Sequence, residues 1–125
     1  MNWAAVAAIL LALAVALGAF GAHGLRARLD ASGMASVYEK AVFYHFIHAL
    51  GMLLVSVLAR TGALTPAAQD RVAWLLLAGI VLFSGSLYLL ALSEIKILGA
   101  ITPLGGVAFI VGWVLLAIEL SRSRG

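Results

Sequence analysis

No charged residue occurs between Trp3 and Ala22, so the chain opens with a continuous apolar run. About 20 residues at 1.5 Å per residue reach about 30 Å, the thickness of the hydrocarbon core of a bilayer. The run lacks the basic residues that begin a secretory signal peptide, and it exceeds that peptide's usual apolar length of about 7–15 residues. It therefore predicts an uncleaved transmembrane helix.

Three further apolar segments follow, and the four together predict an all-α fold, an integral membrane four-helix bundle. The predicted spans are at about residues 3–22, 38–59, 72–92 and 98–119, with a short interfacial helix at about residues 25–32.

Two Thr-Pro pairs mark helix starts, because threonine caps a helix well and proline suits its first position. Thr65-Pro66 precedes the third span. Thr102-Pro103 gives the last span a second possible start at about residue 103, and we favour this version. Residues 97–101 would then form an apolar connector at the membrane interface.

The composition supports a membrane protein. The 125 residues are 65% hydrophobic and 10% charged, whereas soluble domains average about 45–50% and about 25%. This length allows one domain, residues 1–125. Without cysteine, disulfides, thiolate metal sites and cysteine nucleophiles are excluded. The net charge of +3 is typical of loops beside anionic lipid headgroups, and no basic patch interleaved with aromatics points to nucleic acid.

Aromatic residues divide between the two expected membrane faces, as Trp and Tyr do at lipid headgroups. Four spans place both termini on one side. The predicted positions put Trp3, Trp74 and Trp113 toward that side and Tyr38, Tyr44 and Tyr88 toward the other.

Basic residues do not decide which side is cytoplasmic, because Arg60, Arg71, Arg122 and Arg124 on the termini side balance Arg26, Arg28, Lys40 and Lys96 on the other. The first helix often dominates orientation. Its basic residues follow it rather than precede it, which favours termini outside the cell.

Small residues indicate where helices pack closely, because lipid offers no hydrophobic drive for association. Ala4, Ala8, Ala12 and Ala16 recur at every fourth position, and we predict that they form a packing face. Gly85, Gly105 and Gly106 are predicted to make close helix contacts. The alternative is that alanine is merely frequent in this chain.

Two histidines, His45 and His48, lie three residues apart inside the second span. Ionisable residues at membrane depth usually face the bundle interior and are functional candidates. They could line a polar pocket or relay protons, or ligate a metal or haem with His23 as a third ligand. The alternative is structural: each imidazole forms hydrogen bonds within the bundle. The candidate pocket comprises Tyr44, His45, His48, His23, Ser84, Ser86, Glu94 and Lys96.

Three stretches are similar to a known family: GAFGAHGL at residues 18–25, KAVFYHFIHAL at 40–50 after Tyr38, and FSGSLY at 83–88 continuing to LGAITPLGG at 98–106 and Trp113. They resemble the YgdD/YwdK-like family of small bacterial inner-membrane proteins, which has a mitochondrial transmembrane relative in animals. The resemblance implies four membrane helices and no assigned activity.

No catalytic set converges in the sequence. It contains no Gly-rich phosphate cradle, nucleophile elbow or paired carboxylates at catalytic spacing. We therefore expect no enzyme activity, no cofactor and no dedicated metal site. The expected role is a structural or accessory protein of the bacterial inner membrane that contacts the lipid bilayer and self-associates or serves a larger complex. The alternative is a minimal carrier or proton-linked permeation protein that uses His45 and His48.

Overall fold

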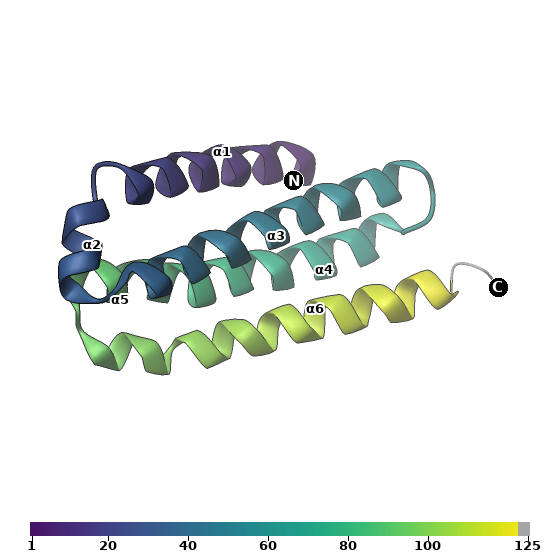
Figure 1. Cartoon of the computed structure of the whole chain (residues 1–125). Helices are drawn as coiled ribbons and strands as arrows, with labels where there is room; N and C mark the ends of the chain where they lie inside the picture. Colours follow the sequence, from purple (N-terminus) through teal and green to yellow (C-terminus); the bar gives the residue numbers. More distant parts are fainter. Residues whose placement is uncertain (123–125) are drawn as a thin grey trace.

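A computed structural model describes residues 1–122, and each long helix runs antiparallel to the next one along the chain (Figure 1). The elements, in order, are α1 (Trp3–Ala22), α2 (Arg26–Ser32), α3 (Ala35–Arg60), α4 (Pro66–Gly79), η1 (Ile80–Ser84), α5 (Gly85–Ser93), η2 (Lys96–Ala100) and α6 (Thr102–Arg122). Element η1 is one π-helical turn that joins α4 and α5 into a single rod, and η2 is a 3-10 helix. Arg124 lies outside the described residues.

Four helical segments, called rods below, are long and apolar enough to cross a membrane: Trp3–Ala22, Ala35–Arg60, Pro66–Ser93 and Lys96–Arg122. The predicted four-helix membrane bundle is confirmed. The short helix expected at about residues 25–32 is α2, which crosses one end of the bundle between α1 and α3. Gly33, with φ +74°, ends it in a left-handed conformation that suits glycine.

The two Thr-Pro pairs behave differently. The side chain of Thr65 accepts a hydrogen bond of 3.1 Å from the amide of Ala68, and Pro66 begins α4, as predicted. The last long helix begins at Thr102, one residue before the favoured start, so Thr102 is its first residue rather than its cap, and η2 occupies the connector. The Thr102 hydroxyl forms a 2.6 Å hydrogen bond with that of Ser86.

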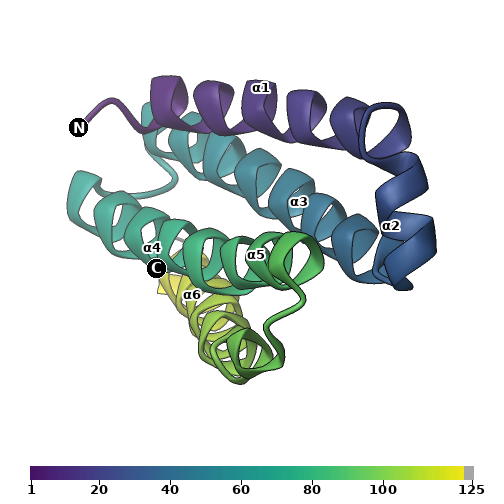
Figure 2. The ribbon, with the colours of Figure 1, turned by 90° about the vertical axis from the view of Figure 1, so that its left-hand side faces the viewer.

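The rods divide into an inner pair and two outer helices. Helix α1 packs against α3, and α6 packs against α4 and η1, so α3 and the α4–η1–α5 rod lie between them (Figure 2). In the most apolar window of each span, 44% and 39% of residues are buried in the inner rods, against 17% and 22% in the outer ones. The outer faces are therefore the surfaces presented to lipid.

Glycines set the closest approaches between α6 and the inner rods. A Cβ atom on Gly105 would lie 2.3 Å from the amide nitrogen of Phe83 in η1, so the two backbones are in direct contact there. Gly79 likewise leaves no room for a Cβ, which would overlap the ring of Phe109, and Gly112 is a tight contact, since a Cβ there would lie 3.0 Å from the end of the Leu76 side chain.

Of the predicted glycines, Gly105 therefore lies at a close helix contact, whereas Gly85 does not. A Cβ on Gly85 would approach only the carbonyl oxygen of Ile80 in the preceding turn, at 4.0 Å. A Cβ on Gly106 would make an ordinary contact of 3.9 Å with the Phe83 ring. The reason is rotation: neighbouring residues point about 100° apart on a helix, so only one of Gly105 and Gly106 faces η1.

The predicted alanine face of α1 is also wrong for packing within the chain. Ala8, Ala12 and Ala16 are exposed, and Ala4 is half-buried. The buried residues are instead Trp3, Ala7, Ala14 and Gly21. A series with four-residue spacing drifts about 40° per step around a helix, whereas seven-residue spacing drifts only about 20°. The seven-residue series therefore stays against α3 along the length of α1.

The tryptophans do not all mark one membrane face. Trp3 and Trp74 meet edge to face with ring centroids 5.0 Å apart, and Trp3 Nε1 donates a 2.7 Å hydrogen bond to Asp70. These contacts are near the termini end. Trp113 instead packs against His48 and Gly51, midway along α3, so its predicted interfacial position is wrong.

Candidate functional site

His45 connects three helices near the middle of the bundle. The residue is 3% exposed, and a 2.8 Å hydrogen bond joins its Nδ1 to the Tyr88 hydroxyl on α5. Its Nε2 is enclosed without a hydrogen bond of acceptable geometry among residues 1–122, although the ring interacts with the backbone of Leu10 on α1. A buried polar side chain in this position helps to fix how α3 sits against its neighbours.

His48 lies one turn further along α3 and belongs to an aromatic stack. Its Nδ1 donates a 2.7 Å hydrogen bond to the carbonyl oxygen of Tyr44 in its own helix. Because a carbonyl oxygen only accepts, Nδ1 carries the proton. The ring stacks on Phe109 with centroids 3.5 Å apart, and Tyr44 and Trp113 flank it at 5.8 Å. The imidazole therefore acts as one flat ring among several that join α3 to α6.

The two predicted serines also form hydrogen bonds with backbone or neighbouring helices, as serines in membrane helices usually do. Ser84 Oγ donates a 2.8 Å hydrogen bond to the carbonyl oxygen of Ala41 on α3. Ser86 Oγ donates to the carbonyl oxygen of Phe83 at 2.9 Å and pairs with Thr102 on α6. Both side chains are buried, and their hydrogen bonds connect the α4–η1–α5 rod to α3 and to α6.

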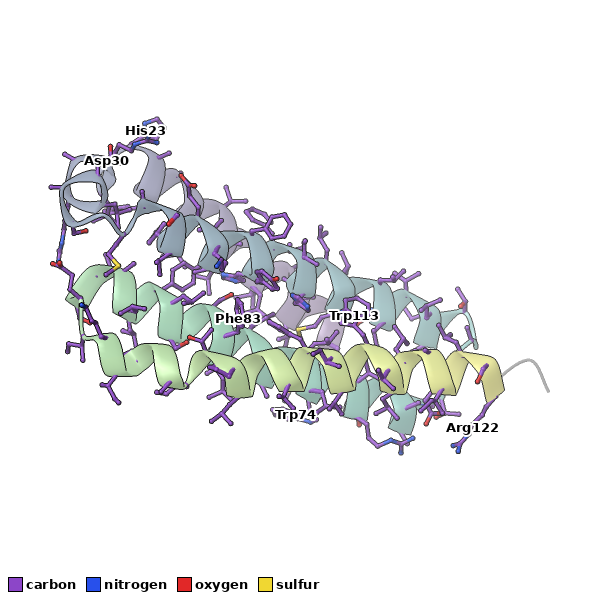
Figure 3. All side chains as sticks on the ribbon, turned by 60° about the horizontal axis from the view of Figure 1, so that its bottom comes forward. His23, Asp30, Trp74, Phe83, Trp113 and Arg122 are labelled. Atoms are coloured by element: carbon purple, nitrogen blue, oxygen red, sulfur yellow. The ribbon has the colours of Figure 1, made fainter. Side chains whose placement is uncertain are left out.

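The remaining members of the predicted pocket do not join this cluster. His23, Glu94 and Lys96 are all exposed, and Figure 3 shows His23 beyond α2, turned away from Phe83 and Trp113. Glu94 adopts a left-handed backbone conformation, with φ 59°, that ends α5. The eight predicted residues therefore form an inner group of five, with three residues on the surface.

A metal site with His23 as third ligand is not formed. Among residues 1–122 no group of three or more His, Cys, Asp or Glu side chains is placed to hold a metal ion. His45 and His48 each use one ring nitrogen for a protein hydrogen bond, to Tyr88 and Tyr44 respectively.

Two features of the inner group escaped prediction. The π-helical turn η1 has no clear sequence signal beyond Ser84-Gly85-Ser86, although such turns often occur at functional sites. Phe109 contacts His48, Tyr44 and Phe83. Nothing in the sequence distinguishes it from the other apolar residues of α6.

Comparison with known proteins identifies relatives for this bundle. A family model described as "Protein of unknown function (DUF423)" matches residues 17–106. The chain belongs to this family. The match runs from the end of α1 to the start of α6, so it includes the inner rods and their polar group.

Curated relatives agree with this assignment. A UPF0382 membrane protein of Staphylococcus saprophyticus is 53% identical over 106 residues, 85% of each chain. The UPF0382 membrane protein YwdK of Bacillus subtilis is 51% identical over 110 residues, again 85% of each. No solved structure matches. The resemblance to the YgdD/YwdK-like family is confirmed, and the chain is a multi-pass membrane protein whose relatives are uncharacterised.

Proposed function

We propose that this protein is a structural or accessory membrane protein without enzyme activity, and that residues 1–125 act as one domain. The observation that carries the proposal is how the inner polar group is used. His45, His48, Ser84 and Ser86 each form a hydrogen bond with a protein group. Polar groups used in this way stabilise the arrangement of helices rather than offering a site to a solute.

The carrier alternative receives less support. Alternating-access carriers usually contain repeated halves that move against each other around a central site. Here α6 is joined to the inner α4–η1–α5 rod by glycine contacts such as that of Gly105 with Phe83, which resist such movement. The relatives' names also assign no transport.

The test is a proton-flux measurement in proteoliposomes under a potassium diffusion potential, with a pH-sensitive dye inside. We expect the wild-type protein, the double variant His45→Ala/His48→Ala and protein-free liposomes to leak protons at the same rate. A wild-type flux that the double variant abolishes would replace the accessory role with the carrier role.

We further propose that the protein self-associates or joins a larger membrane complex. Supporting this, the outer helices expose many large apolar side chains, including Ile9 and Leu13 on α1 and Ile110 and Val114 on α6. Because the chain lacks cysteine, the single variants Ala12→Cys and Val114→Cys report directly on these faces. Disulfide cross-linking from at least one is expected. Absence of cross-links from both, with only a monomer released from native membranes, would contradict self-association.

For location we propose the bacterial cytoplasmic membrane, with both termini outside. The sequence relatives are bacterial membrane proteins, and the basic residues Arg26 and Arg28 follow α1 rather than precede it. A reporter fused after residue 125 that is active only in the cytoplasm should be inactive in cells. An active reporter would reverse the orientation.

A further inference from the structure

An apolar groove opens where α1, α2 and α3 meet, with a volume of about 420 Å³. One wall is the end of α1 at Gly18 and Ala22, the opposite wall is α3 at Phe43 and Phe46, and Leu29 of α2 closes the end. We propose that this groove binds one phospholipid whose headgroup carries both a phosphate and a primary ammonium.

The groove is preformed by the way α1 lies on α3. A Cβ on Gly21 would lie 2.3 Å from the Tyr38 ring, and one on Gly18 would lie 3.3 Å from Val42. The Tyr38 hydroxyl donates a hydrogen bond to the carbonyl oxygen of Leu17, which fixes the ring in place. An unfilled apolar groove loses dispersion contacts along its walls, so in a bilayer an acyl chain is its natural occupant.

Two side chains of opposite charge, Arg26 and Glu39, lie at the same groove, and both are exposed. Arg26 uses only its Nε, which lies 3.0 Å from Asp30. Within residues 1–122 its two terminal amino groups have no hydrogen bond, and Glu39 has neither an ion pair nor a hydrogen bond. The groove thus offers the two terminal amino groups of Arg26 as hydrogen-bond donors and the carboxylate of Glu39 as an acceptor.

This pair of charges selects among lipids. The planar fork of Arg26 suits phosphate oxygens, and Glu39 suits an ammonium that still carries N–H donors. With Asp30 beside Arg26, the three charged groups sum to −1, which disfavours a purely anionic headgroup. A quaternary ammonium such as that of phosphatidylcholine has no N–H to donate to Glu39, so phosphatidylethanolamine fits best.

Native mass spectrometry of the delipidated full chain, mixed with one lipid at a time, tests this. We expect one phosphatidylethanolamine per chain to be retained about three- to tenfold better than phosphatidylglycerol or phosphatidylcholine of the same acyl chains. Glu39→Gln should remove the preference over phosphatidylcholine, and Arg26→Gln should weaken retention of all three. Lys96→Gln, an exposed charge at the same end but outside the groove, is the matched control.

A variant that fills the groove tests the site independently of charge. Ala22 is exposed at the groove, so Ala22→Phe can fold while occupying part of the acyl-chain space. It should lower retention of phosphatidylethanolamine several-fold and remove the thermal stabilisation that this lipid gives the wild type. Equal retention of the three lipids by the wild type, retention unchanged in Ala22→Phe, or a second copy of the chain bound in place of lipid would overturn the proposal.

Discussion

Helix α3 has two unlike sides. The side that faces α4–η1–α5 and α6 packs closely: Trp113 lies against Gly51, and His48 stacks on Phe109. Hydrogen bonds also join α3 to η1 and α5 on this side. Toward α1, helix α3 meets small residues at Ala7, Ala14 and Gly21, and one end of that interface opens into the groove.

The difference shows that one side of α3 holds the helices together while the other side borders the groove. In lipid, helices associate through close packing and interhelical hydrogen bonds rather than through the hydrophobic effect. The side toward α4–η1–α5 has hydrogen bonds between His45 and Tyr88 and between Ser84 and Ala41, and Phe109 of α6 stacks on His48. The α1 side is held at the termini end by the Trp3–Asp70 hydrogen bond and at the α2 end by Tyr38. The groove lies at the α2 end, where Tyr38 is one of its lining residues.

The largest expected effect comes from adding one methyl group on the tight side. In Gly105→Ala the new Cβ would collide with the Phe83 backbone, which a rotamer change cannot relieve. We expect a loss of about 3 kcal/mol or more in the free energy of unfolding, measured by SDS titration in mixed micelles. The control is Gly106→Ala, whose Cβ meets nothing closer than 3.9 Å; equal losses in both variants would show that α6 is rotated from its described position.

A smaller effect is expected on the α1 side, where Ala7 belongs to a buried apolar cluster whose side chains can adjust. Ala7 is fully buried and Ala8 is exposed. Ala7→Leu should cost about 1–3 kcal/mol by overpacking, and Ala8→Leu less than about 0.5 kcal/mol. The same SDS titration measures both, and a larger loss in Ala8→Leu would restore the alanine face predicted from the sequence.

The smallest loss of stability is expected when a single tyrosine hydroxyl group is removed on either side of α3. Tyr88→Phe keeps the ring but leaves His45 Nδ1 unpaired, which should cost about 1 kcal/mol. Tyr38→Phe should cost less, because the Leu17 carbonyl lies within helix α1 and has a backbone donor available. Thermal unfolding in detergent ranks the two; a greater loss in Tyr38→Phe would mean that the α1 side carries more of the stability than its packing indicates.

The sequence predicted where the four membrane-spanning helices lie along the chain, but not which face of each helix packs against its neighbours. Length and charge locate a span, because about 20 uncharged residues match the bilayer, and Thr65-Pro66 located the start of α4. A membrane helix is apolar on every face, however, so periodicity does not separate its lipid side from its protein side. Ala7 and Ala8, or Gly105 and Gly85, are chemically identical until their neighbours are known.

For the buried polar residues, too, the sequence predicted the position along the chain but not the contacts. The sequence identified His45, His48, Ser84 and Ser86 as residues that face the interior, because polar side chains at membrane depth rarely face lipid. It did not identify their partners, since His45 and Tyr88 are 43 residues apart and meet only when the rods align. His23, Glu94 and Lys96 were grouped with them by membrane face alone, which does not determine contact.

The central claim is that four rods cross the bilayer and enclose a dry polar centre. Labelling of single cysteines in sealed proteoliposomes by a membrane-impermeant maleimide tests it most directly. Three matched changes suffice: Ala31→Cys and Ala67→Cys, exposed at opposite ends of the bundle, and Ala49→Cys, fully buried in the middle of α3. We predict that residues 31 and 67 label from opposite sides of the membrane and that residue 49 labels from neither. Labelling of 31 and 67 from the same side, or of 49 before the protein is unfolded, would contradict the account.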